Sequence, residues 1–155
     1  YKLKFMSKKQ VEKDYVVPPL EGLWWAEDMG AFVERDKSTW DWTMMIMQPE
    51  WITQAMFESA AAQVKEQKDL PALSHGQPRG LPLRLETYHE GLCLQILHTG
   101  SYEDEAPVLQ RLHHEFMPQN GYIPAGKHHE IYLGDPRRTA PEKLKTVIRQ
   151  PVQRV

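Results

Sequence analysis

The sequence predicts an α+β fold in which helices cover one face of an antiparallel sheet. Short apolar runs, some alternating with polar residues, indicate strands. Two longer stretches repeat apolar residues at helical spacing. The turns between strands are too short for the crossovers that parallel strands require. The chain of 155 residues suits one domain, or two small modules that share a core.

Composition and charge exclude several classes of protein. Lys and Arg number 19 against 21 Asp and Glu, a net charge of −2, which provides no basic surface for nucleic acid. No apolar run approaches the roughly 20 residues that span a bilayer, and no secretory signal is visible. The single Cys93 excludes an internal disulfide and a Cys-type zinc site. We therefore expect a cytoplasmic protein with no nucleic-acid or membrane partner, and the oligomeric state stays open.

The first elements follow from prolines and apolar runs. Tyr1 to Met6 alternates apolar and basic residues like the end of a helix, which favours a chain that begins inside a larger product over a tag remnant or a disordered leader. An apolar run, Leu20 to Trp25, follows two prolines that stop any helix. A polar loop is expected over 27–38, and a buried strand over Trp42 to Gln48.

A first long helix is predicted from Trp51 to about Lys68, after Pro49. Its apolar stripe consists of Ile52, Ala55, Met56, Ala60 and Val64. A loop over 74–82 contains two Gly and two Pro. Leu83 to Tyr88 alternates as a half-buried strand does, and we expect it to form a hairpin with a strand that contains Leu92, Leu94 and Ile96.

The second helix is predicted to begin after Gly100. Ser101 and Asp104 resemble a capping box, and the acidic run Glu103 to Glu105 suits the positive end of the helix dipole. Pro118 and Gly121 are expected to end the helix. Its buried stripe should comprise Val108, Leu109, Leu112 and Phe116. Strands over His128 to Leu133 and Lys145 to Arg149 complete the sheet. The element order thus repeats, approximately 1–90 and 91–155.

Glu130 and Tyr132 form the first candidate site. Alternation along their strand puts both on one side with His128, and Ile131 and Leu133 on the other. We expect the apolar pair under the helices and the polar trio on the open face, where it would contact one small ligand. An ordinary solvated strand face is the alternative reading.

Tryptophans form the second candidate site, because Trp24-Trp25 and Trp40-Asp41-Trp42 lie close together in sequence beside a Met-rich strand. Aromatic walls with one acidic group hold cationic or flat aromatic ligands, although large aromatics also commonly fill cores. The His113-His114 and His128-His129 pairs lack metal-ligand spacing, so no metal site is expected. Cys93 fits packing better than nucleophilic attack, because it has no adjacent base.

Four motifs resemble those of the GyrI-like small-molecule-binding proteins. They are Pro19-Leu20-Glu21-Gly22-Leu23-Trp24-Trp25, Met47-Gln48-Pro49-Glu50-Trp51, His98-Thr99-Gly100-Ser101-Tyr102 and Lys127 through Arg138 (KHHEIYLGDPRR). The likeness covers about Val16 to Val152 and is closest to a stand-alone bacterial branch that resembles the cyclopropanoid cyclopropyl hydrolases. Two departures stand out: family members carry a strand and a helix before the residues that resemble Tyr1 to Lys9, and His75 to Pro82 looks long.

The resemblance implies duplicated β-α-β-β (SHS2-like) modules with a ligand cleft between the halves, similar to effector-binding domains of multidrug-sensing activators. It implies Glu130 as the acidic cleft residue and Tyr132 as its catalytic partner, without a cofactor or a metal. The ligand-binding residues expected beside them are Trp24, Trp25, Trp42, Met45, Met47, Tyr88, His98 and Tyr102. The implied activity is a hydrolase that opens the cyclopropane of flat DNA-alkylating compounds. A drug-sequestering protein without chemistry and a protein-partner module are the alternatives.

Overall fold

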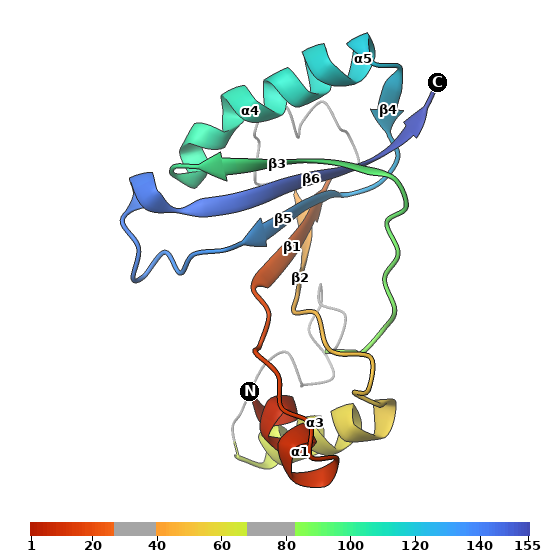
Figure 1. Ribbon diagram of the computed structural model, residues 1–155, viewed down its shortest axis with the longest axis vertical. Helices are drawn as coiled ribbons and strands as arrows, with labels where there is room; N and C mark the ends of the chain where they lie inside the picture. Colours follow the sequence, from red (N-terminus) through yellow and green to blue (C-terminus); the bar gives the residue numbers. More distant parts are fainter. Residues whose placement is uncertain (27–39, 68–82) are drawn as a thin grey trace. The chain divides into compact units, whose positions relative to one another are not determined.

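The computed structural model describes residues 1–26, 40–67 and 83–155. These residues form two compact units, each built from two stretches of chain (Figure 1). Unit 1 comprises Tyr1–Pro18 and Met47–Tyr88, and unit 2 comprises Pro19–Ile46 and His89–Val155. The loops predicted over 27–38 and 74–82 lie outside the described residues. The division into repeats at 1–90 and 91–155 stays a prediction.

The described residues of unit 1 are built around two helices, α1 (Lys2–Gln10) and α3 (Gln54–Gln67). The helical pattern at the start of the chain is therefore confirmed, and α3 lies within the predicted range. The apolar stripe of α3 meets α1 in a small core whose buried members are Met6, Ile52, Met56 and Ala60. Beside this core the buried Ser7 accepts a hydrogen bond from Trp51 Nε1, at 3.0 Å, and donates one to the Lys13 carbonyl, at 2.7 Å.

The strand predicted at Leu83 to Tyr88 is wrong, and so is its hairpin, because these residues lie in no strand. Leu85 packs against the core of unit 1, whereas Leu83 is exposed. The intended partner, β3 (Cys93–Thr99), pairs along its whole length with the C-terminal strand instead. Residues 83–88 belong to unit 1, whereas β3 is the terminal strand of the sheet in unit 2, so the segment is not its partner.

Unit 2 contains an antiparallel sheet, as predicted. Its strands are β1 (Leu20–Trp25), β2 (Asp41–Met45), β3, β4 (Tyr122–Pro124), β5 (His128–Tyr132) and β6 (Lys145–Arg154). Their order is β2-β1-β5-β6-β3, with β4 paired to β6. The strand predicted over Trp42 to Gln48 ends at Met45 and lies at the sheet edge, so it is not buried: Trp42 is 60% exposed.

One continuous helical stretch runs along the sheet (Figure 1). It begins with a 3₁₀ turn, Tyr102–Glu105, continues through α4 (Ala106–Gln110) and a π-helical turn, Arg111–Phe116, and ends with α5 (Met117–Gln119). The capping box is not formed, because the Ser101 hydroxyl donates to the Asp104 carboxylate at 2.7 Å rather than to the helix backbone. A further 3₁₀ turn, Pro141–Lys143, precedes β6.

The π-helical turn changes which side chains of this helix are buried. A π turn contains more residues than an α turn, so the buried position after Leu112 moves one residue along. Met117 is accordingly 1% exposed and packs with Ile148 and Val152 of β6, whereas the predicted Phe116 is 49% exposed. Val108, Leu109 and Leu112 contact this core as expected.

The predicted faces of β5 are reversed. Glu130 lies opposite Ile148 of β6, and directly paired residues of antiparallel strands point to the same side. Ile148 is fully buried against Leu112 and Met117 of the helix. His128, Glu130 and Tyr132 therefore lie on the helix-covered face rather than on the open one. Within the described residues, no helix has the length and apolarity that crossing a membrane requires.

Candidate functional site

A chain of hydrogen bonds links four side chains on the helix-covered face of unit 2. Tyr132 Oη donates to Glu130 Oε2 at 2.7 Å, and Trp24 Nε1 donates to Tyr132 Oη at 2.9 Å. The other carboxylate oxygen, Glu130 Oε1, lies 3.1 Å from His128 Nε2. Strand geometry sets this arrangement: His128, Glu130 and Tyr132 alternate along β5, and Trp24 of β1 pairs with His128.

The side chains of this hydrogen-bonded chain are largely buried. The Glu130 side chain is 13% exposed and that of His128 is 1% exposed. Gly22 provides the space for it. A Cβ at this position would lie 2.8 Å from Trp24 Nε1, 2.9 Å from Tyr132 Oη and 3.2 Å from Met44 Cε. The glycine of the Leu20–Trp25 strand thus allows the indole and the phenol to meet.

Aromatic rings lie against two members of this hydrogen-bonded chain, Tyr132 and Trp24. The Tyr102 ring, from the 3₁₀ turn, meets the Tyr132 ring edge-on with centroids 5.8 Å apart. Trp24 contacts Trp40 and Trp42, with centroids 6.0 Å and 6.5 Å away. Edge-on and tilted pairs of this kind hold rings in defined positions. Because Trp42 remains largely exposed, indole surface is accessible next to the hydrogen-bonded chain.

The electrostatics of the site favour a neutral phenol. Burial, followed by the charge and the hydrogen bond of Glu130, raises the pKa of Tyr132 well above its ordinary value, and Glu105 adds to the effect. Burial, with smaller effects of Glu105 and Glu130, likewise raises the pKa of Tyr102. Both phenols are therefore protonated at neutral pH and can donate hydrogen bonds to a ligand oxygen.

His113 of the π-helical turn is a neutral neighbour of this site. Burial lowers its pKa to about 4, with contributions from the nearby His128 and His114. A neutral imidazole here adds no positive charge beside His128. The interior behind Glu130 is therefore polar without being strongly cationic.

The structure brings together five of the residues predicted for the site. They are Glu130, Tyr132, Trp24, Trp42 and Tyr102, connected by the bonds and ring contacts above. His98 also lies buried on the same face, one strand beyond β6. Its Nε2 is 3.0 Å from the Ser101 carbonyl oxygen, so it fixes the turn that leads to Tyr102.

Of the four other predicted residues, two lie on the far face of the same sheet and two belong to the other unit. Trp25 and Met45 pair with Asp41 and Glu21, which puts them on the opposite face of the sheet. There Lys127 Nζ lies 3.4 Å from the centroid of the Trp25 ring. Met47 and Tyr88 belong to unit 1. Their roles in ligand binding, and the cleft between the halves, stay predictions.

Three residues at the site were not predicted from the sequence. Met44 takes the place expected for Met45, because the register of β2 puts Met44 opposite Gly22. Glu105, only 3% exposed, affects the pKa of both phenols. The burial of Glu105 could have been predicted, because it precedes Val108, Leu109 and Leu112 at helical spacing and so belongs to the buried stripe. Gly22 has no signal in a single sequence.

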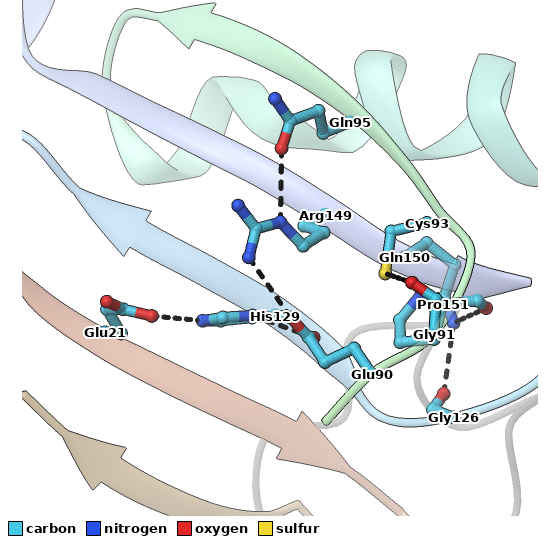
Figure 2. Close-up of polar contacts among 10 residues, drawn as sticks. All are labelled: Glu21, Glu90, Gly91, Cys93, Gln95, Gly126, His129, Arg149, Gln150 and Pro151. Atoms are coloured by element: carbon cyan, nitrogen blue, oxygen red, sulfur yellow. Dashed lines mark hydrogen bonds and ion pairs between the residues drawn. The ribbon is translucent and has the colours of Figure 1, made fainter. Parts of the chain in front are cut away.

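The opposite face holds Cys93, the only cysteine of the chain. Burial and the nearby Glu90 raise the pKa of its thiol, and its Sγ lies 3.6 Å from the Gly91 carbonyl oxygen (Figure 2). A raised pKa is the reverse of what activates a nucleophilic thiol. The packing role predicted for Cys93 agrees with this environment.

Comparisons with known proteins complete the description of the site. The GyrI-like small molecule binding domain matches over residues 2–153. An uncharacterized conserved protein from Listeria innocua is 36% identical with a TM-score of 0.78, and the match covers 99% of this chain and 74% of that one. A hydrolase from Listeria innocua is 33% identical with a TM-score of 0.74, over 99% and 73% of the two chains.

A further structure of a Listeria innocua hydrolase is 34% identical with a TM-score of 0.76, over 99% of this chain and 74% of that one. The search of curated proteins found no significant match. The motifs that resemble this family and contain Glu130 and Trp24 fall inside the matched range. This chain belongs to the GyrI-like family of small-molecule-binding domains.

Proposed function

We propose that the protein is a hydrolase that binds flat aromatic compounds beside Glu130 and opens a strained cyclopropane ring with water. The observation that carries the proposal is the hydrogen-bonded chain from Glu130 through Tyr132 to Trp24, set among aromatic rings. Two similar solved structures are of hydrolases, which supports hydrolytic chemistry. The cyclopropane substrate rests on the resemblance of the sequence motifs.

The reaction needs a base next to the attacked carbon. In the proposed step Glu130 accepts a proton from water as the water oxygen bonds to a cyclopropane carbon. The ring C–C bond breaks, and its electron pair moves into the conjugated dienone of the substrate, which becomes a phenolate. The phenolate then takes up the proton that Glu130 received, so the net change is the addition of one water molecule. A buried carboxylate suits this role because little bulk water competes for it.

Tyr132 has a supporting role in the same step. Its raised pKa keeps the phenol protonated, so it can donate to the oxygen on which negative charge develops. In the structure its proton is donated to Glu130, at 2.7 Å. Once Glu130 takes a proton from water, its demand for that hydrogen bond falls, and the Tyr132 hydroxyl becomes available to the product oxygen.

The decisive experiment compares Glu130→Gln with the parent protein on a DNA-alkylating spirocyclopropane dienone. Loss of a general base typically slows a step about 10²–10⁴-fold. We expect a loss of that size in turnover, measured by mass spectrometry of the ring-opened product. Glu115→Gln, on the exposed side of the helical stretch, is the matched control and should retain full turnover. Equal rates for Glu130→Gln and the parent would overturn the assignment.

A second function, binding without chemistry, is favoured by the exposed indole of Trp42 next to a buried carboxylate. Aromatic faces and one negative charge together attract flat cations. Titration with ethidium, followed by tryptophan fluorescence, tests this function. Saturable quenching together with unchanged spirocyclopropane in the parent protein would support a sequestering protein and exclude the hydrolase.

A further inference from the structure

His129, next to Glu130 in β5, bonds two carboxylates on the opposite face of the sheet. Its Nδ1 lies 2.8 Å from Glu90 Oε1, and its Nε2 lies 2.8 Å from Glu21 Oε2 (Figure 2). The group is buried: the exposed fraction is 2% for the His129 side chain, 14% for Glu21 and 11% for Glu90. Both ring nitrogens are thus engaged by acids away from bulk water.

Arg149 of β6 extends this cluster across the sheet. It lies opposite His129 in the strand register and donates from one terminal nitrogen to Glu90 Oε2, at 3.1 Å. Its Nε donates to Gln95 Oε1 of β3, also at 3.1 Å. The resulting row of contacts runs from β1 through β5 and β6 to β3 (Figure 2). In the described part of the chain, no group of three or more His, Cys, Asp or Glu side chains is placed to hold a metal ion.

The hydrogen bonds of His129 call for a doubly protonated ring when both acids are ionised. An ionised carboxylate only accepts hydrogen bonds, and a neutral imidazole has one N–H donor and one bare nitrogen. A bare nitrogen facing a carboxylate oxygen at 2.8 Å would be repelled, so two ionised partners require two N–H donors. The imidazolium and Arg149 then balance the charges of Glu21 and Glu90. Balanced charges are what a buried ionic cluster requires.

Glu21 and Glu90 lie close to the two points where the chain enters unit 2. Unit 2 is assembled from two stretches, which begin at Pro19 and at His89. Glu21 follows the first of these starting points and Glu90 follows the second. His129 therefore fastens both points where the chain enters unit 2 to the central strand β5. The same strand carries Glu130 on its other face.

We propose that His129 is a positioning residue: as an imidazolium shared by Glu21 and Glu90, it anchors both starting points of unit 2 and holds Glu130 in place. It does not touch the proposed site, because neighbouring strand residues point to opposite faces. Its influence passes through the backbone of β5. The link to Glu130 rests on the proposed function, whereas the anchor itself does not.

The first measurement is spectroscopic. In ¹⁵N-histidine-labelled protein at neutral pH, the two ring nitrogens of His129 should have nearly equal shifts and each should couple to a proton, as in an imidazolium. The signal is assigned by its absence in His129→Gln. A neutral ring with one bare nitrogen would overturn the proposal.

The second measurement uses charge balance. His129→Gln leaves two acids with one arginine, and we expect the melting midpoint to fall by roughly 5–15 °C. Adding Glu21→Gln removes the surplus negative charge, so the double variant should melt at a higher temperature than His129→Gln alone. His114→Gln, an exposed histidine of the helical stretch, is the matched control and should melt like the parent. A double variant that melts lower than His129→Gln would contradict the anchor.

Turnover of the spirocyclopropane dienone provides the third measurement. We expect His129→Gln to lose about tenfold to a hundredfold in turnover through misplacement of Glu130, and the double variant to recover part of the loss. Unchanged turnover in a folded His129→Gln protein would overturn the positioning role. If the parent protein itself shows no turnover, the proposed function fails, and the spectroscopic and melting measurements still decide the anchor.

Discussion

Gly22 offers a sharp test of the candidate site, because a single methyl group added there meets its central hydrogen bond. In Gly22→Ala the new Cβ would lie 2.8 Å from Trp24 Nε1 and 2.9 Å from Tyr132 Oη. Separations below 3 Å are repulsive, and both atoms belong to the bond that joins the indole to the phenol. One of the two rings must therefore move.

The size of the effect follows from three contributions. Forcing an extra carbon into a packed site destabilises by about 1–3 kcal/mol. Losing the bond between Trp24 and Tyr132 adds about 0.5–1.5 kcal/mol. Replacing glycine reduces the freedom of the unfolded chain, which returns about 0.4–1 kcal/mol. We expect a net loss of about 0.5–4 kcal/mol in the free energy of unfolding.

Urea denaturation followed by tryptophan fluorescence measures this loss. The control is the same substitution in a Tyr132→Phe background, where the hydroxyl that meets the new carbon is absent. There Gly22→Ala should be less costly by about 1 kcal/mol, since no hydrogen bond remains to break. Equal losses in the two backgrounds would refute the geometry. Ligand titration of Gly22→Ala should also show weaker binding if the aromatic rings form the ligand surface.

Three further predictions concern protonation and packing. His113 is neutral in the folded protein, with a pKa of about 4, and would be protonated below about 6.5 when unfolded. Its contribution to stability is therefore present above pH 6.5 and lost as the pH falls towards 4. In His113→Phe the melting midpoint should therefore change less with pH across this range. Because the pKa of Tyr132 is raised, the folded protein should lose stability as the pH rises above about 10, where the unfolded phenol ionises. Tyr132→Phe should reduce this alkaline loss in a titration of melting midpoints, and the raised pKa values of Tyr15 and Tyr102 should account for a remainder. Met117→Ala should destabilise by about 2–5 kcal/mol in urea denaturation and Phe116→Ala by much less, and the reverse order would contradict the π-helical register.

Local patterns predicted the elements of the chain well and their partners less well. The apolar spacing of α3 and the alternation of β5 are properties of neighbouring residues, and both elements lie close to their predicted positions. The Leu83 to Tyr88 segment shows the limit: its residues alternate in the sequence but lie in no strand, because strand pairing depends on the partner that the rest of the fold supplies. β3 pairs with β6 and ends the sheet of unit 2, whereas residues 83–88 belong to unit 1, and nothing within residues 83–88 encodes this.

The sequence predicted several residues of the candidate site but put them on the wrong face of the sheet. Alternation correctly grouped Glu130 with Tyr132, and the resemblance assigned Glu130 as the acidic residue of the site. Which side of a strand faces the helices depends on its partner, however, and here the deciding neighbour is Ile148 of β6. The assumption that apolar residues lie under helices failed, because the buried polar side chains of β5 satisfy one another. The choice of Met45 over Met44 failed for the same reason of register.

The reversal of faces changes what the polar residues of β5 must do. A carboxylate on an open face is solvated and needs no partner, whereas one beneath a helix is costly unless hydrogen bonds compensate it. Glu130 meets this requirement through His128 and Tyr132 on its own strand, and His129 meets it through Glu21 of β1 on the other face. Glu21 and Trp24 of β1 each serve one face of β5, with Gly22 between them leaving room. Substitutions in β1 should therefore separate the two networks: Trp24→Phe should disturb the environment of Tyr132 and leave the His129 imidazolium signal unchanged, while Glu21→Gln should do the reverse.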